Sequence, residues 1–363
     1  MNLIRPSYEI IEQGPGLQGI YDIIENAGKT SYKSEVKGGE TAKRFVEARS
    51  KEGHGAVLEF GTVYLQKDVN YDDRCYWEEM NWSEFYKNNP HSKVVYRPQN
   101  KYGVVKKTGE PVSTAITRCY ITTNYRVLVE NNRLDDLKYM CEPTEHHEKR
   151  YCVRFIVDRF TGEEFLRHRV FSFCRESSRY CNYSKEKFGG NITYIIPPWI
   201  PSTELAEGEN ITWWDGDWVN MNKMSIVKYG SVNPLHNRVD TWLRALAGAE
   251  QKYMALTNDW TLFDDIDDEE KKAWQAQQAR TILPCAIKSP LAMCGFASDW
   301  IHFFHLRSLG TTGAPHPQAK ELAEPLMNEF LKRGYITEKE LYTCSIPTRK
   351  EALMRTDIIK KEE

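Results

Sequence analysis

Residues 167–180 read Arg-His-Arg-Val-Phe-Ser-Phe-Cys-Arg-Glu-Ser-Ser-Arg-Tyr and hold four arginines, one histidine and three serines. Guanidinium groups are planar, permanently charged forks that match phosphate oxygens, and serine hydroxyls add neutral donors. Apolar side chains alternate with these charges, so the segment is expected to lie partly buried rather than form a solvated basic face. Because burying several arginines without an anion is costly, the stretch predicts a pocket for an anionic ligand, with a nucleotide phosphate as the best candidate.

The composition of the whole chain limits the other classes of function. The 363 residues carry a net charge of -2, which excludes a strongly basic surface for nucleic acid. The sequence has no apolar run of membrane-spanning length and begins without a secretory signal, so we expect a cytoplasmic protein with no membrane partner. Nine scattered cysteines indicate no disulfide framework. Cys141, His146, His147 and Cys152 lack a standard zinc spacing, so no metal site is predicted.

Hydrophobic periodicity outward from this stretch predicts strands and helices without a regular βαβ alternation. Strands are expected at 7–13, 56–65, 117–123, 152–158 and 192–196. Helices are expected at 17–27, 39–52, 125–138, 161–169, 236–257, 268–281 and 316–333. The pattern therefore predicts a mixed α/β (α+β) fold.

Two glycine-containing segments look like phosphate-binding loops. Residues 14–19 have the form G-x-G-x-x-G between a predicted strand and helix, but no βαβ units follow, so a turn and helix entry is favoured over a dinucleotide loop. Gly28-Lys29-Thr30 lacks the earlier glycine of a P-loop, because Ile23 occupies that position.

The stretch also resembles a known family. Arg167-His168-Arg169, seven further residues and then Ser177 are similar to the signature of the flavin-dependent thymidylate synthases, with Ser172 and Arg179-Tyr180 extending the match. A second block, from Ala279-Arg280 through His302 and Arg307 to His316, follows the same family in order and spacing. Weaker similarity covers residues 1–66.

The resemblance implies a fold, an organisation and an activity. The fold would be a central, mainly antiparallel sheet flanked by helices, in one domain over residues 1–335 with insertions at 67–149 and 203–230 and a C-terminal tail at 336–363. The activity would be a methyltransferase reaction that converts dUMP to dTMP. Methylenetetrahydrofolate would donate the carbon, FAD reduced by NADPH would complete the methyl group, and tetrahydrofolate would leave. The protein would be a homotetramer with active sites where subunits meet.

Site residues follow from the resemblance, position by position. FAD would contact Ser31, Arg167, His168, Arg169 and His302. dUMP would contact Glu164, Ser177, Ser178, Arg179, Arg307 and an Arg280 that reaches in from a neighbouring subunit. Two of these are candidate catalytic residues: Arg307 would stabilise negative charge on the uracil, and Ser177, which has no base beside it, would donate a hydrogen bond rather than act as a nucleophile.

Several positions depart from the family pattern. Cys174 and Arg175 stand where the family usually has Asn-Glu, and Glu164 where it often has Gln. Other polar positions of the family are held here by Phe60, Phe296 and Ser298. The altered loop keeps two alternatives open: a flavin enzyme that modifies another pyrimidine nucleotide, for example by hydroxymethylation, and a non-catalytic nucleotide-binding relative.

Overall fold

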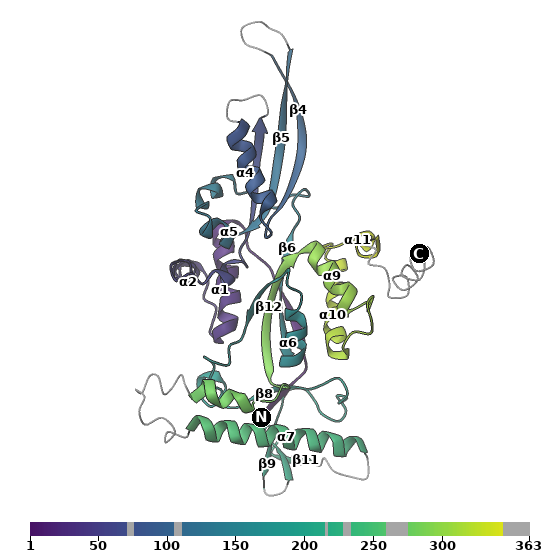
Figure 1. Ribbon diagram of the computed structural model, residues 1–363. Coiled ribbons are helices and arrows are strands. Elements are labelled where there is room, and N and C mark those ends of the chain that lie inside the picture. Colours follow the sequence, from purple (N-terminus) through teal and green to yellow (C-terminus); the bar gives the residue numbers. More distant parts are fainter. Residues whose placement is uncertain (71–75, 105–110, 215–216, 228–233, 259–274, 344–363) are drawn as a thin grey trace, which may run out of the picture.

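A computed structural model describes residues 1–70, 76–104, 111–214, 217–227, 234–258 and 275–343. Its strands form three sheets, of four, three and five strands. Figure 1 shows the four-stranded sheet in the middle of an elongated molecule, with the three-stranded sheet extending from one end and the five-stranded sheet beside a long helix at the other. The predicted mixed α/β fold is confirmed.

The central sheet is antiparallel throughout, as predicted. Its order is β2 (Ser7–Ile11), β6 (Arg150–Asp158), β12 (Lys288–Phe296) and β7 (Ser172–Arg175). Side chains alternate between the two faces of a strand, so neighbouring residues of β6 join different cores. Cys152 packs with residues of α1 (Gly16–Tyr32) on one face, and Val153 packs against helices on the other. Helices therefore cover both faces of the sheet (Figure 1).

The second face of the central sheet supports the helices that carry most of the predicted site. These helices are α6 (Arg159–Leu166), α9 (Ala297–Arg307) and α10 (Pro317–Lys332), followed by α11 (Glu338–Thr343). Trp300, Phe303 and Phe304 of α9 are fully buried against Phe155 of β6 and Phe330 of α10. Burying a large aromatic side chain contributes on the order of 2–3 kcal/mol, so this cluster holds α9 and its last residue rigidly.

The first predicted insertion builds most of the three-stranded sheet. The strands are β3 (Thr62–Asn70), β5 (Pro111–Asn124) and β4 (Lys93–Val104), all antiparallel. The neighbouring helices are α2 (Gly39–Lys51), α3 (Gly55–Leu58), α4 (Tyr76–Asn88) and α5 (Tyr125–Glu130), with a 3₁₀ turn at Leu134–Tyr139.

The second predicted insertion adds strands to the five-stranded sheet. Its order is β11 (Ser225–Val227), β10 (Asp217–Asn220), β9 (Glu209–Trp214), β1 (Asn2–Ile4) and β8 (Thr193–Ile195). Only β1 and β8 are parallel among these pairs. The core of this unit lies between the sheet and α7 (Pro234–Asn258), and two 3₁₀ turns lie at Glu186–Phe188 and Arg280–Ile282.

The structure corrects two details of the predicted elements and tests a third only in part. Residues 56–58 belong to the short helix α3, and the strand predicted from 56 begins only at Thr62, because a short apolar run fits a buried helix as well as a strand. The helix predicted over 125–138 breaks after Glu130, where Asn132 adopts a φ of 55°. The helix predicted over 268–281 falls partly outside the described residues, and its last residues enter the 3₁₀ turn.

The G-x-G-x-x-G segment joins β2 to α1, but β2 pairs antiparallel with β6 rather than forming a βαβ unit. A Cβ atom at Gly19 would lie only 1.8 Å from the carbonyl oxygen of Gly14. The glycine therefore allows the loop to fold tightly onto the start of the helix, which is a packing role. None of the helices in the described part of the chain is long and apolar enough to cross a membrane.

Candidate functional site

Helix α6 positions the residues of the signature stretch. The Asp158 carboxylate caps its N-terminus by accepting the backbone N–H of Thr161 at 2.7 Å. At its other end the buried ring of Phe165 holds the helix down, and the N–H of His168 donates to the Phe165 carbonyl. Phe171 then packs so closely on Gly295 that a Cβ atom there would lie 2.5 Å from the ring. Buried aromatic residues thus hold the charged residues between them at the surface.

A cavity of about 700 Å³ opens at the C-terminal end of α6, and we call it the His168 cavity. The predicted residues that line it are Glu164, Arg167, His168, Arg169, His302 and Arg307. The loop 312–316 closes one side, which brings in His316. Six of the predicted residues, from two sequence blocks more than 130 residues apart, therefore meet in one place.

Arg307, at the end of α9, is held by three hydrogen bonds. Its Nη1 donates to Glu164 Oε2 at 2.6 Å, and its Nη2 donates to the Glu164 carbonyl at 2.7 Å. Its Nε donates to His168 Nε2 at 3.0 Å. The guanidinium is therefore fixed in orientation before any ligand arrives, which is the property needed in a group that stabilises charge in a transition state.

His168 is a neutral imidazole in this arrangement. Burial, and then the nearby Arg307 guanidinium, lower the pKa of His168 from 6.5 to about 4. Because Nε2 accepts the Arg307 hydrogen bond, the ring proton lies on Nδ1. The exposed His302 ring lies 6.1 Å from the His168 ring, centroid to centroid. The cavity thus presents a fixed cation and a neutral donor side by side.

This pKa shift leads to a pH dependence of stability. Between pH 6.5 and 4 the unfolded chain binds a proton at His168 that the folded chain does not bind, so the free energy of unfolding falls as the pH is lowered through this range. The loss assigned to His168 is about 2–3 kcal/mol. Urea unfolding of His168→Asn should show a flatter pH dependence by this amount. Parallel curves for wild type and variant would contradict the assignment.

A second cavity, of about 610 Å³, is lined by Arg159 and Glu163 of α6, and we call it the Ser177 cavity. Its lining residues are Arg159, Glu163, Arg175, Glu176, Ser177, Ser178, Arg280 and Thr281. The turn after β7 places Ser177 there, because the Ser177 N–H donates to the carbonyl of Ser31 at 3.0 Å. Three residues predicted to bind dUMP (Ser177, Ser178 and Arg280) are therefore brought together within a single chain.

Two predicted residues lie elsewhere than the prediction implied. The Arg179 guanidinium lies over the Tyr180 ring, 5.7 Å from its centroid, and does not line the Ser177 cavity. Ser31 contacts Ser177 and Cys174 rather than the Arg167–Arg169 turn, and its Oγ lies 3.0 Å from Cys174 Sγ. Arg280 was expected to arrive from a neighbouring subunit, yet the chain's own Arg280 already lines the cavity with Ser177.

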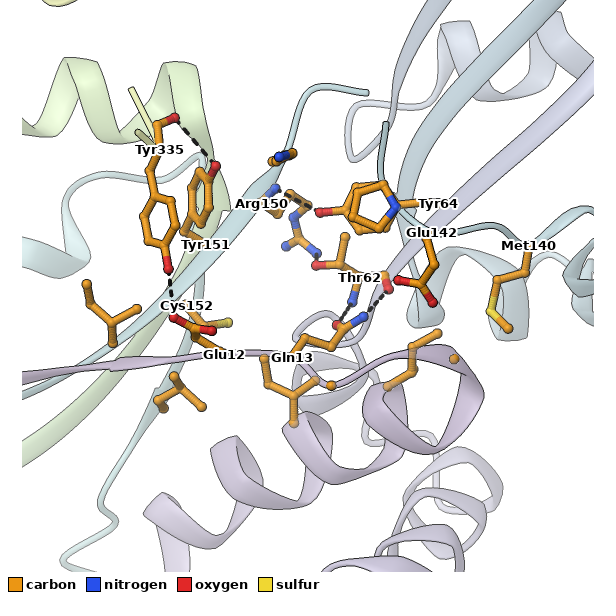
Figure 2. Close-up of a pocket in the computed structure, with 18 of the residues that line it drawn as sticks. Glu12, Gln13, Thr62, Tyr64, Met140, Glu142, Arg150, Tyr151, Cys152 and Tyr335 are labelled. Atoms are coloured by element: carbon orange, nitrogen blue, oxygen red, sulfur yellow. Dashed lines mark hydrogen bonds between the residues drawn. The ribbon is translucent and has the colours of Figure 1, made fainter. Parts of the chain in front are cut away.

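A third cavity, of about 450 Å³, contains none of the predicted site residues. Figure 2 shows that polar groups on its wall are paired with one another. Tyr335 donates to Glu12 at 2.8 Å, and the Gln13 amide exchanges two hydrogen bonds with the backbone of Thr62, both 2.8 Å long. The Tyr151 and Tyr335 rings stack 4.1 Å apart. These contacts join the segment before α1 to β3 and to the turn after α10, and that turn to β6.

A comparison with family models identifies the family to which the chain belongs. The model described as thymidylate synthase complementing protein matches residues 140–333, more than half of the chain. The chain belongs to this family. The resemblance predicted from the Arg-His-Arg stretch is therefore confirmed, and the match spans both cavities.

Solved structures of one relative are also similar. They show the UMP/dUMP methylase PolB from Streptomyces cacaoi, bound with 5-Br dUMP in one case and with 5-Br UMP in the other. Both have 14% sequence identity and a TM-score of 0.36. The first comparison covers 92% of this chain and 93% of that one, and the second covers 91% of each. No curated protein matches the chain.

The residues of the His168 cavity fit a flavin nucleotide. Arg167 and Arg169 are exposed at the cavity, and neither forms an ion pair within the described ranges. Two free guanidinium groups complement the two negative charges of a diphosphate. A volume of about 700 Å³ is within the range of small-molecule sites. With His302 and the Nδ1–H of His168, these groups could hold FAD.

Three residues that depart from the family pattern make well-defined contacts inside this chain. Phe60 is fully buried between α1 and the central sheet, and Phe296 is nearly so, with the Arg150 and Lys93 cations over its ring. The Ser298 hydroxyl donates to the Glu148 carboxylate. These three positions are thus engaged in packing or hydrogen bonds inside the chain.

Sequence reasoning missed Arg159, the first residue of α6, whose Nη2 donates to Ser178 Oγ at 3.2 Å in the Ser177 cavity. The helix was predicted to begin at residue 161, so Arg159 was not part of a recognised element. Which cavity it reaches depends on the packing of α6 beside the turn that carries Ser178, and a sequence pattern does not reveal this.

Proposed function

We propose that the protein is a flavin-dependent thymidylate synthase that methylates C5 of dUMP, with methylenetetrahydrofolate as carbon donor and NADPH as reductant. One structural observation supports the proposal in addition to the family match. The two cavities beside α6 separate two kinds of anion site: free guanidinium groups at Arg167 and Arg169 on one side, and Ser177 with Arg280 on the other. A flavin nucleotide and a nucleoside monophosphate are two of the anionic ligands that this family's reaction uses.

In the proposed mechanism Arg307 acts on the uracil ring. The reaction makes C5 a nucleophile, and negative charge develops on the carbonyl oxygens of the pyrimidine. Arg307 is held in place by Glu164 and His168, so it can stabilise this charge without reorganising. The neutral state of His168 matters here, because a second cation beside Arg307 would weaken its hydrogen bond.

Ser177 and Arg280 hold the phosphate in the proposal. The only hydrogen bond recorded for the Ser177 hydroxyl in the described structure is a long one, 3.4 Å, from the backbone N–H of Arg179, and no base accepts its proton. It is therefore suited to donate to a phosphate oxygen and unsuited to attack the pyrimidine. FAD bound at the His168 cavity would supply the hydride that completes the methyl group. The protein's part is to orient the substrates and exclude water.

The proposal also includes assembly. Arg280 lines the Ser177 cavity and Arg307 lines the His168 cavity, and neither residue lines both cavities. We therefore propose that each active site combines the Ser177 cavity of one subunit with the His168 cavity of another, as expected for a homotetramer.

Turnover with isotopically labelled methylenetetrahydrofolate and dUMP, followed by mass analysis of the nucleotide, tests the activity. We expect dTMP that carries the label, formed only with FAD and NADPH present. A hydroxymethyl product or a preference for another pyrimidine would support the alternative reaction. A purified protein that is colourless and takes up no added FAD would instead indicate a non-catalytic relative.

A further inference from the structure

Helix α6 carries an arginine and a glutamate at the spacing that normally forms an ion pair. Arg159 and Glu163 are four residues apart, so their side chains lie on one face of the helix. The structure does not pair them. Glu163 Oε1 instead accepts a 2.6 Å hydrogen bond from Nη1 of Arg175, which comes from β7.

Arg175 is fixed by further contacts. Its Nε donates to Ser289 Oγ at 2.7 Å, and its Nη2 donates to the Arg159 carbonyl at 3.4 Å. Strand β12 supplies Ser289, so the guanidinium is anchored to the central sheet on one side and to α6 on the other. Arg175 therefore neutralises Glu163 and keeps its carboxylate away from Arg159.

Arg159 is left to face the cavity. Its backbone N–H donates to the Cys285 carbonyl at 2.9 Å, and its Nη2 reaches Ser178 Oγ. In the part of the chain that the structure describes, neither Arg159 nor Arg280 forms an ion pair, and both line the Ser177 cavity.

The remaining carboxylate of the cavity is already balanced. Glu176 is buried, accepts a 2.8 Å hydrogen bond from the Tyr183 hydroxyl and lies 4.0 Å from Lys288 Nζ. The cavity therefore presents two uncompensated positive charges, Arg159 and Arg280, next to two serine hydroxyls. These two positive charges match the two negative charges of a phosphate dianion.

We propose that Arg159 is a further phosphate-binding residue for the nucleotide, and that Arg175 is a positioning residue that prevents Glu163 from pairing with Arg159. The proposal rests on the proposed function, because it takes the Ser177 cavity as the site of the nucleotide phosphate. It assigns a purpose to Arg175, which stands where the family usually has a carboxylate. Arg175 keeps the cavity positively charged indirectly, because it neutralises Glu163 and leaves Arg159 unpaired.

Calorimetric titration of the full-length protein with dUMP and with deoxyuridine tests the role of Arg159. Arg159→Gln should weaken dUMP binding about 10- to 100-fold, the range for a lost charge-assisted hydrogen bond. Deoxyuridine, which has no phosphate, should bind as it does to the wild type. Arg159→Lys, which keeps the charge, should lose less affinity than Arg159→Gln. Arg44→Gln, on the exposed face of α2, is the matched control and should match the wild type.

The positioning role of Arg175 is tested by rescue. Arg175→Gln should weaken dUMP binding about as much as Arg159→Gln, because Glu163 becomes free to pair with Arg159. Adding Glu163→Gln to Arg175→Gln should restore the affinity to within a few-fold of wild type. A purely structural role for Arg175 predicts that the double variant stays as weak as the single one or becomes weaker.

The outcomes separate this inference from the proposed function. A wild-type protein that binds dUMP no better than deoxyuridine would contradict a phosphate site at this cavity altogether. Wild-type affinity for dUMP in Arg159→Gln and Arg159→Lys, with the phosphate still contributing, would overturn the role of Arg159 alone. Failure of Glu163→Gln to rescue Arg175→Gln would overturn the positioning role of Arg175.

Discussion

Replacing Arg307 with alanine is expected to lower kcat by about 10²- to 10³-fold, the cost of losing one preorganised donor at developing negative charge. Arg307 is the residue on which the two sequence blocks converge, since it binds Glu164 through two nitrogens and His168 through the third. Arg307→Lys should recover little of the loss, because an ammonium group does not reproduce three divergent donors.

Steady-state kinetics with saturating dUMP would measure this effect, and the temperature of unfolding is the companion measurement. Removing Arg307 leaves Glu164 and the buried His168 without their partner, so we expect the folded state to lose about 1–3 kcal/mol as well. A folded Arg307→Ala protein that turns over at the wild-type rate would exclude Arg307 from the uracil site. Arg44→Ala, at an exposed pair on α2, is the control for the loss of a surface arginine.

The second large effect is expected at Arg280. Arg280→Ala should raise the dissociation constant for dUMP about 10- to 100-fold through loss of a charge-assisted phosphate contact. Because the effect acts through phosphate, binding of deoxyuridine should not change. Equilibrium titration of the variant with both ligands measures this difference.

Arg179→Ala is the informative comparison for Arg280. The sequence predicts a loss of the same size at Arg179, whereas the structure places its guanidinium over the Tyr180 ring and outside the lining of the Ser177 cavity. An equal loss in both variants would mean that the nucleotide draws Arg179 inward on binding. A loss at Arg280 alone would assign the phosphate to the residues that already line the cavity.

The two variants together also test the shared active site. If each site takes Arg307 from one subunit and Arg280 from another, then mixing Arg307→Ala with Arg280→Ala after reversible dissociation should produce some sites with both residues intact. At a dUMP concentration near the wild-type dissociation constant, where both variants are impaired, we expect the mixture to be more active than either variant alone. A mixture as inactive as its components, under conditions in which subunits exchange, would place both residues in a site formed by a single chain.

How far the sequence predicts this site depends on how local each contact is. Arg167, His168 and Arg169 lie within one turn, and Ser177 with Ser178 within another, so a contiguous motif was enough to identify both groups. The block around Arg280 and Arg307 was identified through family spacing, and the structure brings it to the same two cavities. The segments expected to be insertions were recognised only as irregular polar and aromatic stretches, because the pairing of strands such as β3 and β5 joins residues remote in the sequence, for example Thr62 and Asn124.

By itself, the amino-acid sequence determined the family, the antiparallel character of the central sheet and the residues that carry charge to the site. The charged residues follow from short motifs, which act over a few residues, and the antiparallel sheet is what the resemblance to the family implies. Only the tertiary structure decided which charges are free. Helix spacing pairs Arg159 with Glu163, but Arg175 from another element takes the carboxylate, and packing alone places Arg179 outside the cavity that Arg280 lines. Ion pairs depend on distance in space, and distance in space is set by the packing of elements that are remote in the sequence.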